Sequence, residues 1–466
     1  MEIDNQEDYK AKTKYGPAQI LIVGFLGLIL VATILLMLPI STNNRVVTPL
    51  IDALFTATSA VCVTGLVVVN TLEYWSLFGK MVILLCIQIG GLGFMTLVSM
   101  IFVITGRRIT LKNRLVMQEA LNFNTTSGVV RFTKLIVNLT LLIEGVGALF
   151  LSFIFIPEYG WIKGIAYSIF HAISAFCNAG FDVIGQNSLM PYVDNGLFNT
   201  IIILLVICGG LGYTVWIDTY RAFRLKFSLA EHFTWKQAFY KLALHTKLVW
   251  VITLILILGG FIFFFLAEYN NPATLGGLSF GDKITAAMFQ SVSPRTAGFN
   301  TIPLADLTTG STIMTIFLML IGGSPAGTAG GIKTVTFGVL MLCAMSVLKG
   351  HSSVVVFKKR IALDQILKAL TIMTIAFIII GVCLIILTFT EDATFIEILF
   401  ETVSAFATVG LTLGITSSLS MLGRIVIILL MFIGRLGLIT IGVALVVRQG
   451  QNTVGIQYPE EKVLVG

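Results

Sequence analysis

A glycine-centred motif occurs four times in this chain, and it limits the possible folds more than any other feature. In each copy the glycine follows a short apolar run, and a polar turn and a long apolar segment come after it. The glycines are Gly65, Gly180, Gly298 and Gly410, which are 115, 118 and 112 residues apart. A repeat at such a spacing indicates one structural unit used four times. We therefore expect four equivalent loops that meet at one axis.

The four motifs also share their flanking residues. A phenylalanine lies ten, ten, nine and ten residues before the glycine, at Phe55, Phe170, Phe289 and Phe400. A serine lies a few residues after each phenylalanine, at Ser59, Ser174, Ser291 and Ser404. A single glycine of this kind is weak evidence, because small residues are common where membrane helices pack. Four copies with matched flanks favour a shared function over four unrelated packing sites.

The composition places the repeated unit in a membrane. Of the 466 residues, 56% are hydrophobic and only 11% are charged, and the mean hydropathy is +0.96. A soluble domain cannot bury that much apolar surface, so the sequence predicts a polytopic membrane protein. The first apolar run is too long for the core of a signal peptide. We expect it to stay in the protein as the first span.

Apolar segments of about 20 residues or more occur in pairs, and a shorter one of about 12 lies between the members of each pair. The long segments are Pro17–Leu38 and Leu77–Ile104, Phe132–Ile156 and Leu197–Trp216, Lys247–Ala267 and Thr312–Leu348, and Gln365–Phe389 and Met421–Val447. The short segments are Leu50–Val61, Gly164–Phe176, Gly281–Ser293 and Thr394–Phe406. We predict an all-α polytopic fold with four tandem helix–pore-helix–loop–helix repeats. Eight transmembrane helices and four re-entrant pore helices would surround a pseudo-fourfold pore.

This pattern divides the chain into a tail and four repeats. The predicted units are a cytoplasmic N-terminal tail at 1–16, the first repeat at 17–106, and the later repeats, each with a preceding cytoplasmic loop, at 107–222, 223–350 and 351–466. The last of these ends in a short C-terminal tail.

The charges predict the orientation. The segments between repeats are basic, with Arg107, Arg108, Lys112, Arg114, Arg131, Lys134, Arg221, Arg224, Lys226, Lys236, Lys241, Lys247, Lys349, Lys358, Lys359, Arg360 and Lys368. The loops inside the repeats are acidic, with Asp52, Glu73, Glu158, Asp182, Asp194, Glu268, Asp282, Asp306, Glu391 and Asp392. The positive-inside rule then places both termini in the cytoplasm and the pore loops at the outer side. It also explains the net charge of +7 without a nucleic-acid partner.

Four half-spanning helices are tolerated at membrane depth only around a water-filled cavity or within protein. Their C-terminal ends would point toward the membrane middle, and the partial negative charge there favours a cation. Rings of backbone carbonyls that replace a hydration shell form potassium filters. We therefore expect K⁺ to bind the carbonyls of a filter made by the residues at each glycine. These residues are Val63, Thr64 and Gly65, Asn178, Ala179 and Gly180, Thr296, Ala297 and Gly298, and Thr408, Val409 and Gly410.

A polar residue follows each shared phenylalanine. These residues are Thr56, His171, Gln290 and Glu401. We expect them to form a layer that supports the filter by hydrogen bonds to its outward-facing backbone. His171 and Glu401 are assigned this structural role rather than direct ion contact. A buried carboxylate is costly, so Glu401 needs a donor partner or a proton.

The second long segment of each repeat has a glycine cluster, and the third cluster is exceptional. We expect close helix packing from the clusters at Gly90–Gly93 and Gly209–Gly212. The third cluster holds five glycines and a proline in ten residues, which excludes a regular helix. We interpret it as a movable gate below the filter. Its residues are Gly322, Gly323, Ser324, Pro325, Ala326, Gly327, Thr328, Ala329, Gly330 and Gly331.

Three charged residues fall in or beside apolar segments. Arg435 lies within the final run, where a charge is a functional-site hypothesis by default, and we assign it to the gate. Lys333 ends the glycine-rich segment and is assigned to the gate too, facing either the cavity or the cytoplasm. Glu144 lies in the first helix of the second repeat, and we expect it to be remote from the filter and to bond a neighbouring helix.

Other functional classes fit the sequence less well. The six cysteines form no CxxC pair, so we expect buried thiols rather than a metal site or disulfides. An intramembrane enzyme would need converging catalytic residues, and His171 is the only histidine expected inside the membrane core. An alternating-access secondary K⁺/Na⁺ symporter is the main alternative, because broken helices occur there. Channel-like flux would favour the pore, and saturable exchange of low turnover would favour the carrier.

At these residues the chain resembles the Trk/Ktr/HKT potassium transporters, and most closely the Ktr-type (NtpJ-like) bacterial membrane subunit. The resemblance runs from Pro17 to the last residues. It rests on Thr64-Gly65, on the segments 176–181, 294–299 and 403–410, on the Gly322–Gly331 break and on Arg435.

The resemblance implies K⁺ uptake by a multi-pass homodimer in the bacterial plasma membrane. It also implies a cytoplasmic ring of RCK-type nucleotide-binding regulatory subunits, through which ATP and ADP would act. No covalently bound cofactor is expected. Many members of the Ktr type are stimulated by Na⁺. In this family a serine in place of the first-loop glycine accompanies Na⁺ permeation, so Gly65 implies K⁺ as the transported ion.

Overall fold

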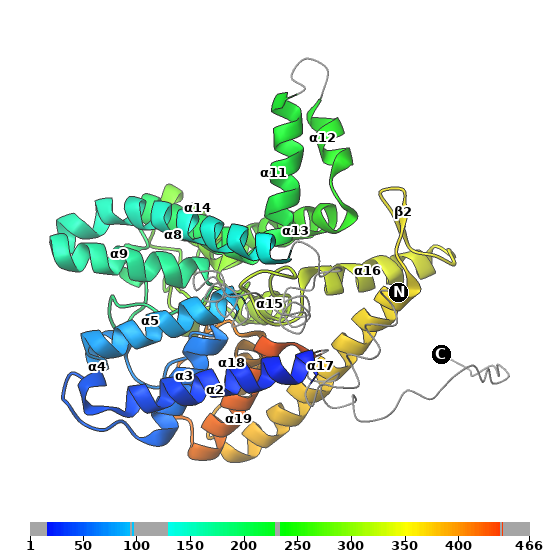
Figure 1. Ribbon diagram of the computed structural model, residues 1–466. Helices are drawn as coiled ribbons and strands as arrows, with labels where there is room; N and C mark the ends of the chain where they lie inside the picture. Colours follow the sequence, from blue (N-terminus) through cyan, green and yellow to red (C-terminus); the bar gives the residue numbers. More distant parts are fainter. Residues whose placement is uncertain (1–15, 94–95, 97–128, 229–233, 439, 441–466) are drawn as a thin grey trace.

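The computed structural model describes residues 16–93, 96, 129–228, 234–438 and 440 (Figure 1). Its four longest apolar helices are the first helices of the four predicted repeats. They are α2 (Pro17–Met37), α8 (Val129–Tyr159), α13 (Leu244–Glu268) and α17 (Leu363–Thr390). All four are long and apolar enough to cross a membrane. Much of their apolar surface is exposed, as suits helices that face lipid.

The four predicted pore helices are present within a few residues of their expected bounds. They are α3 (Leu50–Cys62), α9 (Trp161–Phe176), α14 (Phe280–Val292) and α18 (Phe395–Ala407). Side-chain caps fix the start of two of them, because the hydroxyls of Ser279 and Thr394 accept hydrogen bonds from the N–H groups of Asp282 and Glu397. The C-terminal halves of these helices are buried in the centre of the molecule.

The second helices of the repeats are less regular than the first. They comprise α5 (Leu77–Leu92), α10 (Gly196–Gly210) continued by α11 (Tyr213–Ser228), α15 (Thr309–Leu320) followed by α16 (Thr334–Leu348), and α19 (Met421–Leu436). The predicted ends at Ile104 and Val447 lie outside the described residues. The third segment is interrupted at the glycine-rich stretch, as predicted.

The second of these segments corrects the sequence reading. Leu197–Trp216 is not one helix, because α10 and α11 are bent by 99° at their junction. Gly212 lies there with φ at +88°, a backbone conformation that residues other than glycine rarely adopt. The bend directs α11 away from the bundle, where it projects together with α12 (Trp235–Lys241) (Figure 1).

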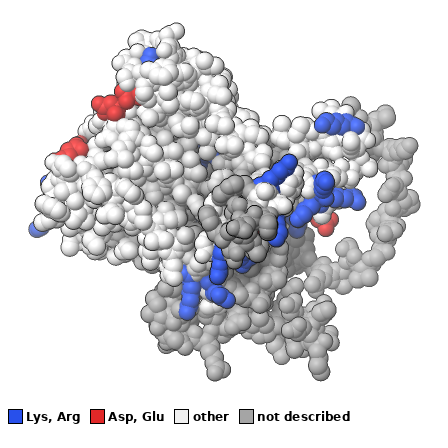
Figure 2. Space-filling model, turned by 90° about the horizontal axis from the view of Figure 1, so that it is seen from above, with Lys and Arg blue, Asp and Glu red and all other residues white. Residues whose placement is uncertain are grey.

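Short elements complete the fold, and one departs from the all-α expectation. The helices are α4 (Thr71–Tyr74), η1 (Pro39–Ser41), η2 (Met190–Tyr192), η3 (Leu304–Asp306) and η4 (Thr416–Ser418). The strands β1 (Val355–Val356) and β2 (Lys359–Arg360) form an antiparallel hairpin, with Val355 opposite Arg360. This hairpin belongs to a predicted cytoplasmic loop. Figure 2 shows most of the visible Lys and Arg side chains grouped together, away from most of the Asp and Glu side chains.

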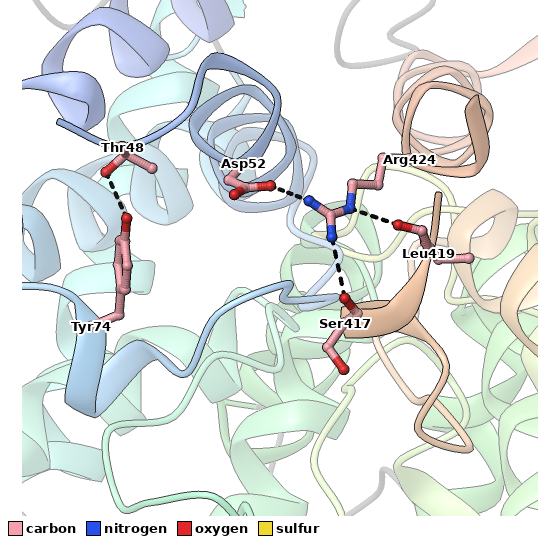
Figure 3. Close-up of polar contacts among 6 residues, drawn as sticks. All are labelled: Thr48, Asp52, Tyr74, Ser417, Leu419 and Arg424. Carbon is pink, nitrogen blue, oxygen red and sulfur yellow. Dashed lines mark hydrogen bonds and ion pairs between the residues drawn. The ribbon is translucent and has the colours of Figure 1, made fainter. Parts of the chain in front are cut away.

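Contacts between helices close the repeats into a ring. The second helix of each repeat packs on the pore helix of the next, as α5 on α9, α10 on α14, α15 on α18 and α19 on α3. The last contact joins the fourth repeat to the first. An ion pair between Arg424 of α19 and Asp52 of α3 lies at this junction (Figure 3). The pore helices are thereby held around a common centre.

The glycine clusters of the second helices permit close packing against the pore helices. A Cβ at Gly90, Gly209 or Gly434 would collide with the carbonyl oxygen of Val61, Phe176 or Phe406. Each of these carbonyls lies at the C-terminal end of a pore helix. The expectation of close packing in the first two repeats is therefore confirmed, and the fourth repeat uses the same contact.

Candidate ion-conduction site

The four glycine motifs adopt the same unusual backbone. The residue two positions before each glycine has positive φ, with 58° at Val63, 59° at Asn178, 73° at Thr296 and 51° at Thr408. This conformation is uncommon for any side chain and strained for the β-branched valine and threonines. The glycines themselves have φ between 69° and 93°. Four copies of one strained turn indicate that the loops have one structural task.

The four glycines form a closed ring in chain order. A Cβ at Gly65 would lie 3.0 Å from the Cα of Gly180, and one at Gly180 would lie 2.9 Å from the Cα of Gly298. A Cβ at Gly298 would lie 3.4 Å from the Cα of Gly410, and one at Gly410 would lie 3.0 Å from the Cα of Gly65. Four loops more than 100 residues apart in sequence therefore meet at one point.

Each glycine of the ring abuts a backbone carbonyl of the next loop. A Cβ at Gly65, Gly298 or Gly410 would collide with the carbonyl oxygen of Ala179, Val409 or Thr64, respectively. A Cβ at Gly180 would lie 3.0 Å from the Ala297 oxygen. Backbone alone fits at this level, so the lining of the ring is made of peptide groups.

Serines at the C-terminal ends of the pore helices form hydrogen bonds with these loops. The amides of Thr64, Ala179, Ala297 and Val409 donate to the carbonyls of Ser59, Ser174, Ser293 and Ser404 at 2.8, 2.8, 2.9 and 2.8 Å. The hydroxyls of Ser59 and Ser404 also accept from the amides of Gly65 and Gly410, both at 3.1 Å. The Ser174 hydroxyl donates to the Phe181 carbonyl at 2.6 Å. These bonds tie the strained turns to rigid helices.

In the third repeat the serine that bonds the loop is Ser293 and not Ser291 of the shared flank. Ser291 donates to the Ile257 carbonyl of α13 and does not contact the loop. Ser293 donates instead to the Phe299 carbonyl, as Ser174 does to Phe181. Ser293 lies four residues after Phe289, as the other serines do after their phenylalanines. Counting from the phenylalanine rather than from the glycine would have identified it, because the third loop is one residue shorter.

Two members of the predicted polar layer support the chain beyond the ring rather than the ring itself. The Nε2 of His171 accepts from the amide of Val183 at 3.4 Å, and its Nδ1 lies 2.8 Å from the Tyr167 carbonyl. Glu401 accepts from the Thr416 hydroxyl at 2.6 Å, which supplies the expected donor partner. Both residues thus anchor the segment that leaves the loop.

In the described residues, the other two members of the layer form no hydrogen bond with the ring or with the segment that follows it. Gln290 donates to the hydroxyl of Thr315 on α15 at 3.4 Å. The Thr56 hydroxyl has no hydrogen bond within the described residues. The expectation that all four bond the predicted filter backbone is therefore wrong. A side chain on a pore helix points back along the helix, toward the preceding turn or a neighbouring helix and away from the loop that follows.

The interrupted stretch between α15 and α16 lies against the ring. It is irregular from Gly322 to Gly331, and Gly331 has φ at +64°. A Cβ at Gly330 would collide with the Thr408 hydroxyl of the fourth loop. On the other side, the Thr328 hydroxyl donates to the Phe176 carbonyl at 3.1 Å. The stretch therefore touches the fourth loop and the end of the second pore helix.

Arg435 connects this stretch to another repeat. Its guanidinium donates to the carbonyls of Thr328 and Gly90, so it joins the stretch to the end of α5. Lys333 donates to the Ala329 carbonyl at 2.5 Å, a bond within the same segment. Both side chains line a cavity of about 260 Å³. Lys333 therefore faces the cavity, which decides between the two positions allowed by the sequence.

Comparison with known proteins identifies the family. The sequence model of the TrkH family, described as a cation transport protein, matches residues 4–454. The chain belongs to this family. It is 40% identical to the potassium/sodium uptake protein NtpJ of Enterococcus hirae over 461 residues, which covers 98% of this chain and 99% of the relative. It is 43% identical to the Ktr system potassium uptake protein B of Bacillus subtilis, with 97% of both chains covered.

A solved structure supports the TrkH-type fold. The crystal structure of the potassium transporter TrkH from Vibrio parahaemolyticus matches with a TM-score of 0.69 and 19% identity. The match covers 91% of this chain and 84% of that one. As a member of the TrkH family, the chain is a membrane-spanning transporter of the potassium/sodium uptake type and not an enzyme.

One residue of this TrkH-family chain lies closer to the ring than the sequence suggested. Glu144 accepts a hydrogen bond from Gln88 of α5 at 3.0 Å, which confirms the expected bond between helices. The other carboxyl oxygen lies 3.8 Å from the Cys177 sulfur, at the start of the second loop. The expectation that Glu144 is remote is therefore wrong. The contact joins segments that are distant in sequence, and no local sequence pattern reports it.

Proposed function

We propose that the protein takes up K⁺ through a selectivity filter formed by the four glycine loops. The observation that supports this most strongly is the closed ring, in which each glycine abuts a carbonyl of the next loop. Backbone carbonyls at close range replace the water around a potassium ion. The filter residues would be those named from the sequence at 63–65, 178–180, 296–298 and 408–410, with K⁺ held by their carbonyls.

The surroundings of the ring suit a cation. Four pore helices end at the ring, and the C-terminal end of a helix carries about half a negative charge. Anionic side chains are not needed at the axis, because carbonyl dipoles and helix ends supply the field. The curated relatives named above are potassium uptake proteins by name, which favours the same ion here.

The irregular stretch is proposed as the gate. Part of the stretch lines the same cavity as Lys333 and Arg435, and its Gly330 abuts the fourth loop, so an ion that leaves the filter would pass it. Its glycines permit a second conformation, and Arg435 holds the present one by two carbonyls. Both gate charges are positive and oppose a cation in the cavity.

Regulation and assembly are proposed from the family. The name of the Bacillus subtilis relative, Ktr system potassium uptake protein B, indicates a system of several components. We propose that the partner of this chain is an RCK-type cytoplasmic ring that binds ATP and ADP. We also propose a homodimer in the bacterial plasma membrane with both termini in the cytoplasm, and Na⁺ as an activating ion. The basic elements α11, α12 and the β1–β2 hairpin would then face the regulator.

The experiment that tests this function measures K⁺ and Na⁺ uptake in cells that lack their own K⁺ transporters. The chain is expressed with and without a Ktr regulatory subunit while external Na⁺ is varied. Gly65→Ser should weaken discrimination against Na⁺, because the added side chain collides with the Ala179 carbonyl. An unchanged K⁺/Na⁺ ratio in a folded Gly65→Ser variant would overturn the filter assignment.

A further inference from the structure

Glu144 is a buried acidic residue in the middle of a membrane-spanning helix. It lies midway along α8, and only 4% of its surface is exposed. A carboxyl group in this environment is costly whether or not it carries a charge. The gate and the filter as described above make no use of it. A residue of this kind needs a local reason, and its contacts supply one.

The Glu144 carboxyl joins three elements. One oxygen accepts from the Gln88 amide of α5 at 3.0 Å. The other lies 3.8 Å from the Cys177 thiol, which follows the last residue of α9. The same thiol lies 3.9 Å from the side-chain oxygen of Gln88. A carboxyl and an amide from two repeats therefore converge on one thiol, which is fully buried.

Cys177 occupies the position at which the second loop begins. Asn178 follows it with φ at +59°, and the Ala179 carbonyl beyond abuts Gly65 in the ring. The thiol has no room to move toward α5, because a Cβ at Gly91 would lie 2.5 Å from its sulfur and 2.9 Å from its Cβ. Its position is thus fixed by Gly91 on one side and by Glu144 on the other.

The first loop provides an internal comparison. Cys62 occupies the position of Cys177, three residues before the glycine, and is equally buried. It is also a free thiol, and the charged group that acts on it in the described part of the chain is Arg435 rather than a carboxyl. Burial of a thiol at this position therefore does not require a carboxyl. The pair of Glu144 and Gln88 is a feature of the second loop.

We propose that Glu144, together with Gln88, is a positioning residue for the second filter loop. Its hydrogen bonds hold the Cys177 thiol, and thereby set the turn at Asn178 and the carbonyl that faces Gly65. The carboxyl acts as a hydrogen-bond partner and not as an ion ligand. The inference rests on the proposed filter, since it assigns a task to one of the four loops.

The test compares Glu144→Leu with Glu144→Gln in the uptake assay. Glu144→Leu removes the bonds to Gln88 and to the thiol. The bond to the thiol is the one that reaches the loop, and its loss should lower the K⁺/Na⁺ uptake ratio about fivefold. Glu144→Gln can still bond Gln88 and the thiol, so it should stay near the wild-type ratio. Monodisperse elution in detergent and an unchanged melting temperature establish that a variant is folded. A folded Glu144→Leu protein with the wild-type ratio would overturn the inference, as would an equal loss in Glu144→Gln.

A matched pair of cysteine variants keeps the test decisive if Glu144→Leu fails to fold. Cys177→Ala and Cys62→Ala remove the same atoms from equivalent positions. We expect Cys177→Ala to lower the ratio and Cys62→Ala to leave it near wild type. The double variant Glu144→Leu/Cys177→Ala should lower the uptake ratio by no more than the more severe single variant does, because the two substitutions remove the same interaction. Equal effects of the two cysteine variants, or additive losses, would contradict the proposal.

The same experiments separate this inference from the filter itself. If Gly65→Ser changes the K⁺/Na⁺ ratio and Glu144→Leu does not, the filter stands and the positioning role fails. If Gly65→Ser has no effect, the filter assignment fails first.

Discussion

At the scale of single residues, the serine hydroxyls behind the loops have the sharpest consequence. Ser404 accepts a hydrogen bond from the amide of Gly410, and in Ser404→Ala that buried amide loses its partner. An unpaired buried donor costs about 1–3 kcal/mol. We expect Ser404→Ala to lower both the melting temperature and the K⁺/Na⁺ uptake ratio, because the strained turn at Thr408 loses its support.

Ser291→Ala is the control for this prediction. Ser291 is a buried serine on a pore helix, but it bonds Ile257 of α13 and not the third loop. Its loss should lower the melting temperature without changing the uptake ratio. An equal change of the ratio in the two variants would show that the hydroxyl bond to the loop is not what matters.

Residue roles were predictable from the sequence where they depend on the backbone, and less so where they depend on side-chain direction. The four glycines are marked by their spacing, and they meet as expected. Thr56 and Gln290 were assigned to the loops because they follow the shared phenylalanine, yet they do not bond them. Glu144 was misplaced because its contact with Cys177 joins distant segments. Spacing along the chain carries no information about such tertiary contacts.

At the scale of elements, Arg435 and the irregular stretch make the clearest prediction. The guanidinium spans from the Thr328 carbonyl to the Gly90 carbonyl, and therefore ties the proposed gate to α5. Arg435→Ala removes both bonds and one positive charge from the cavity. We expect a higher rate of K⁺ uptake without the regulator. The uptake rate of Arg435→Lys should lie between those of the wild type and Arg435→Ala. Lysine keeps the charge, but its ammonium group does not have the forked geometry of a guanidinium.

Lys333→Ala is the matched control for the gate. It also removes a positive charge from the cavity, but its bond to Ala329 stays within the segment. If the tether is what holds the gate, Lys333→Ala should raise uptake less than Arg435→Ala does. Equal increases would assign the effect to charge alone, and no increase in a folded Arg435→Ala variant would contradict the gate.

The helices show which features of the fold a hydropathy pattern predicts and which it misses. The pore helices are predicted within a few residues, because each is a short apolar run that ends at a marked loop. The interruption at Gly322–Gly331 is predicted too, because that composition cannot form a helix. The 99° bend between α10 and α11 was missed, since Leu197–Trp216 remains apolar through the glycines that bend it. Hydropathy reports burial in lipid, whereas the direction of the chain depends on a few backbone angles.

At the scale of the whole molecule, the sequence predicts that the four repeats surround one axis, but it does not show which residues join the fourth repeat to the first. Repeats one to four follow each other along the chain, but only tertiary contacts join the fourth to the first. Arg424 supplies one of them through its pair with Asp52 (Figure 3). It pairs with Asp52 of α3 and donates to the carbonyls of Leu419 at 3.0 Å and Ser417 at 3.2 Å. Arg424 thus holds both the first pore helix and the loop that precedes α19.

The exposure of the ion pair indicates whether the pair or the bonds of Arg424 to the two carbonyls contribute more to stability. The side chains of Arg424 and Asp52 are 20% and 18% exposed, and a partly exposed ion pair contributes about 0–1 kcal/mol. Asp52→Asn should therefore lower the melting temperature of the detergent-purified protein only slightly. Arg424→Ala also frees two carbonyls and should lower it by more. Glu73→Gln, at an exposed acidic residue whose side chain accepts a hydrogen bond from Gln186, should change the melting temperature little. Equal losses in Asp52→Asn and Arg424→Ala would mean that the ion pair alone closes the ring.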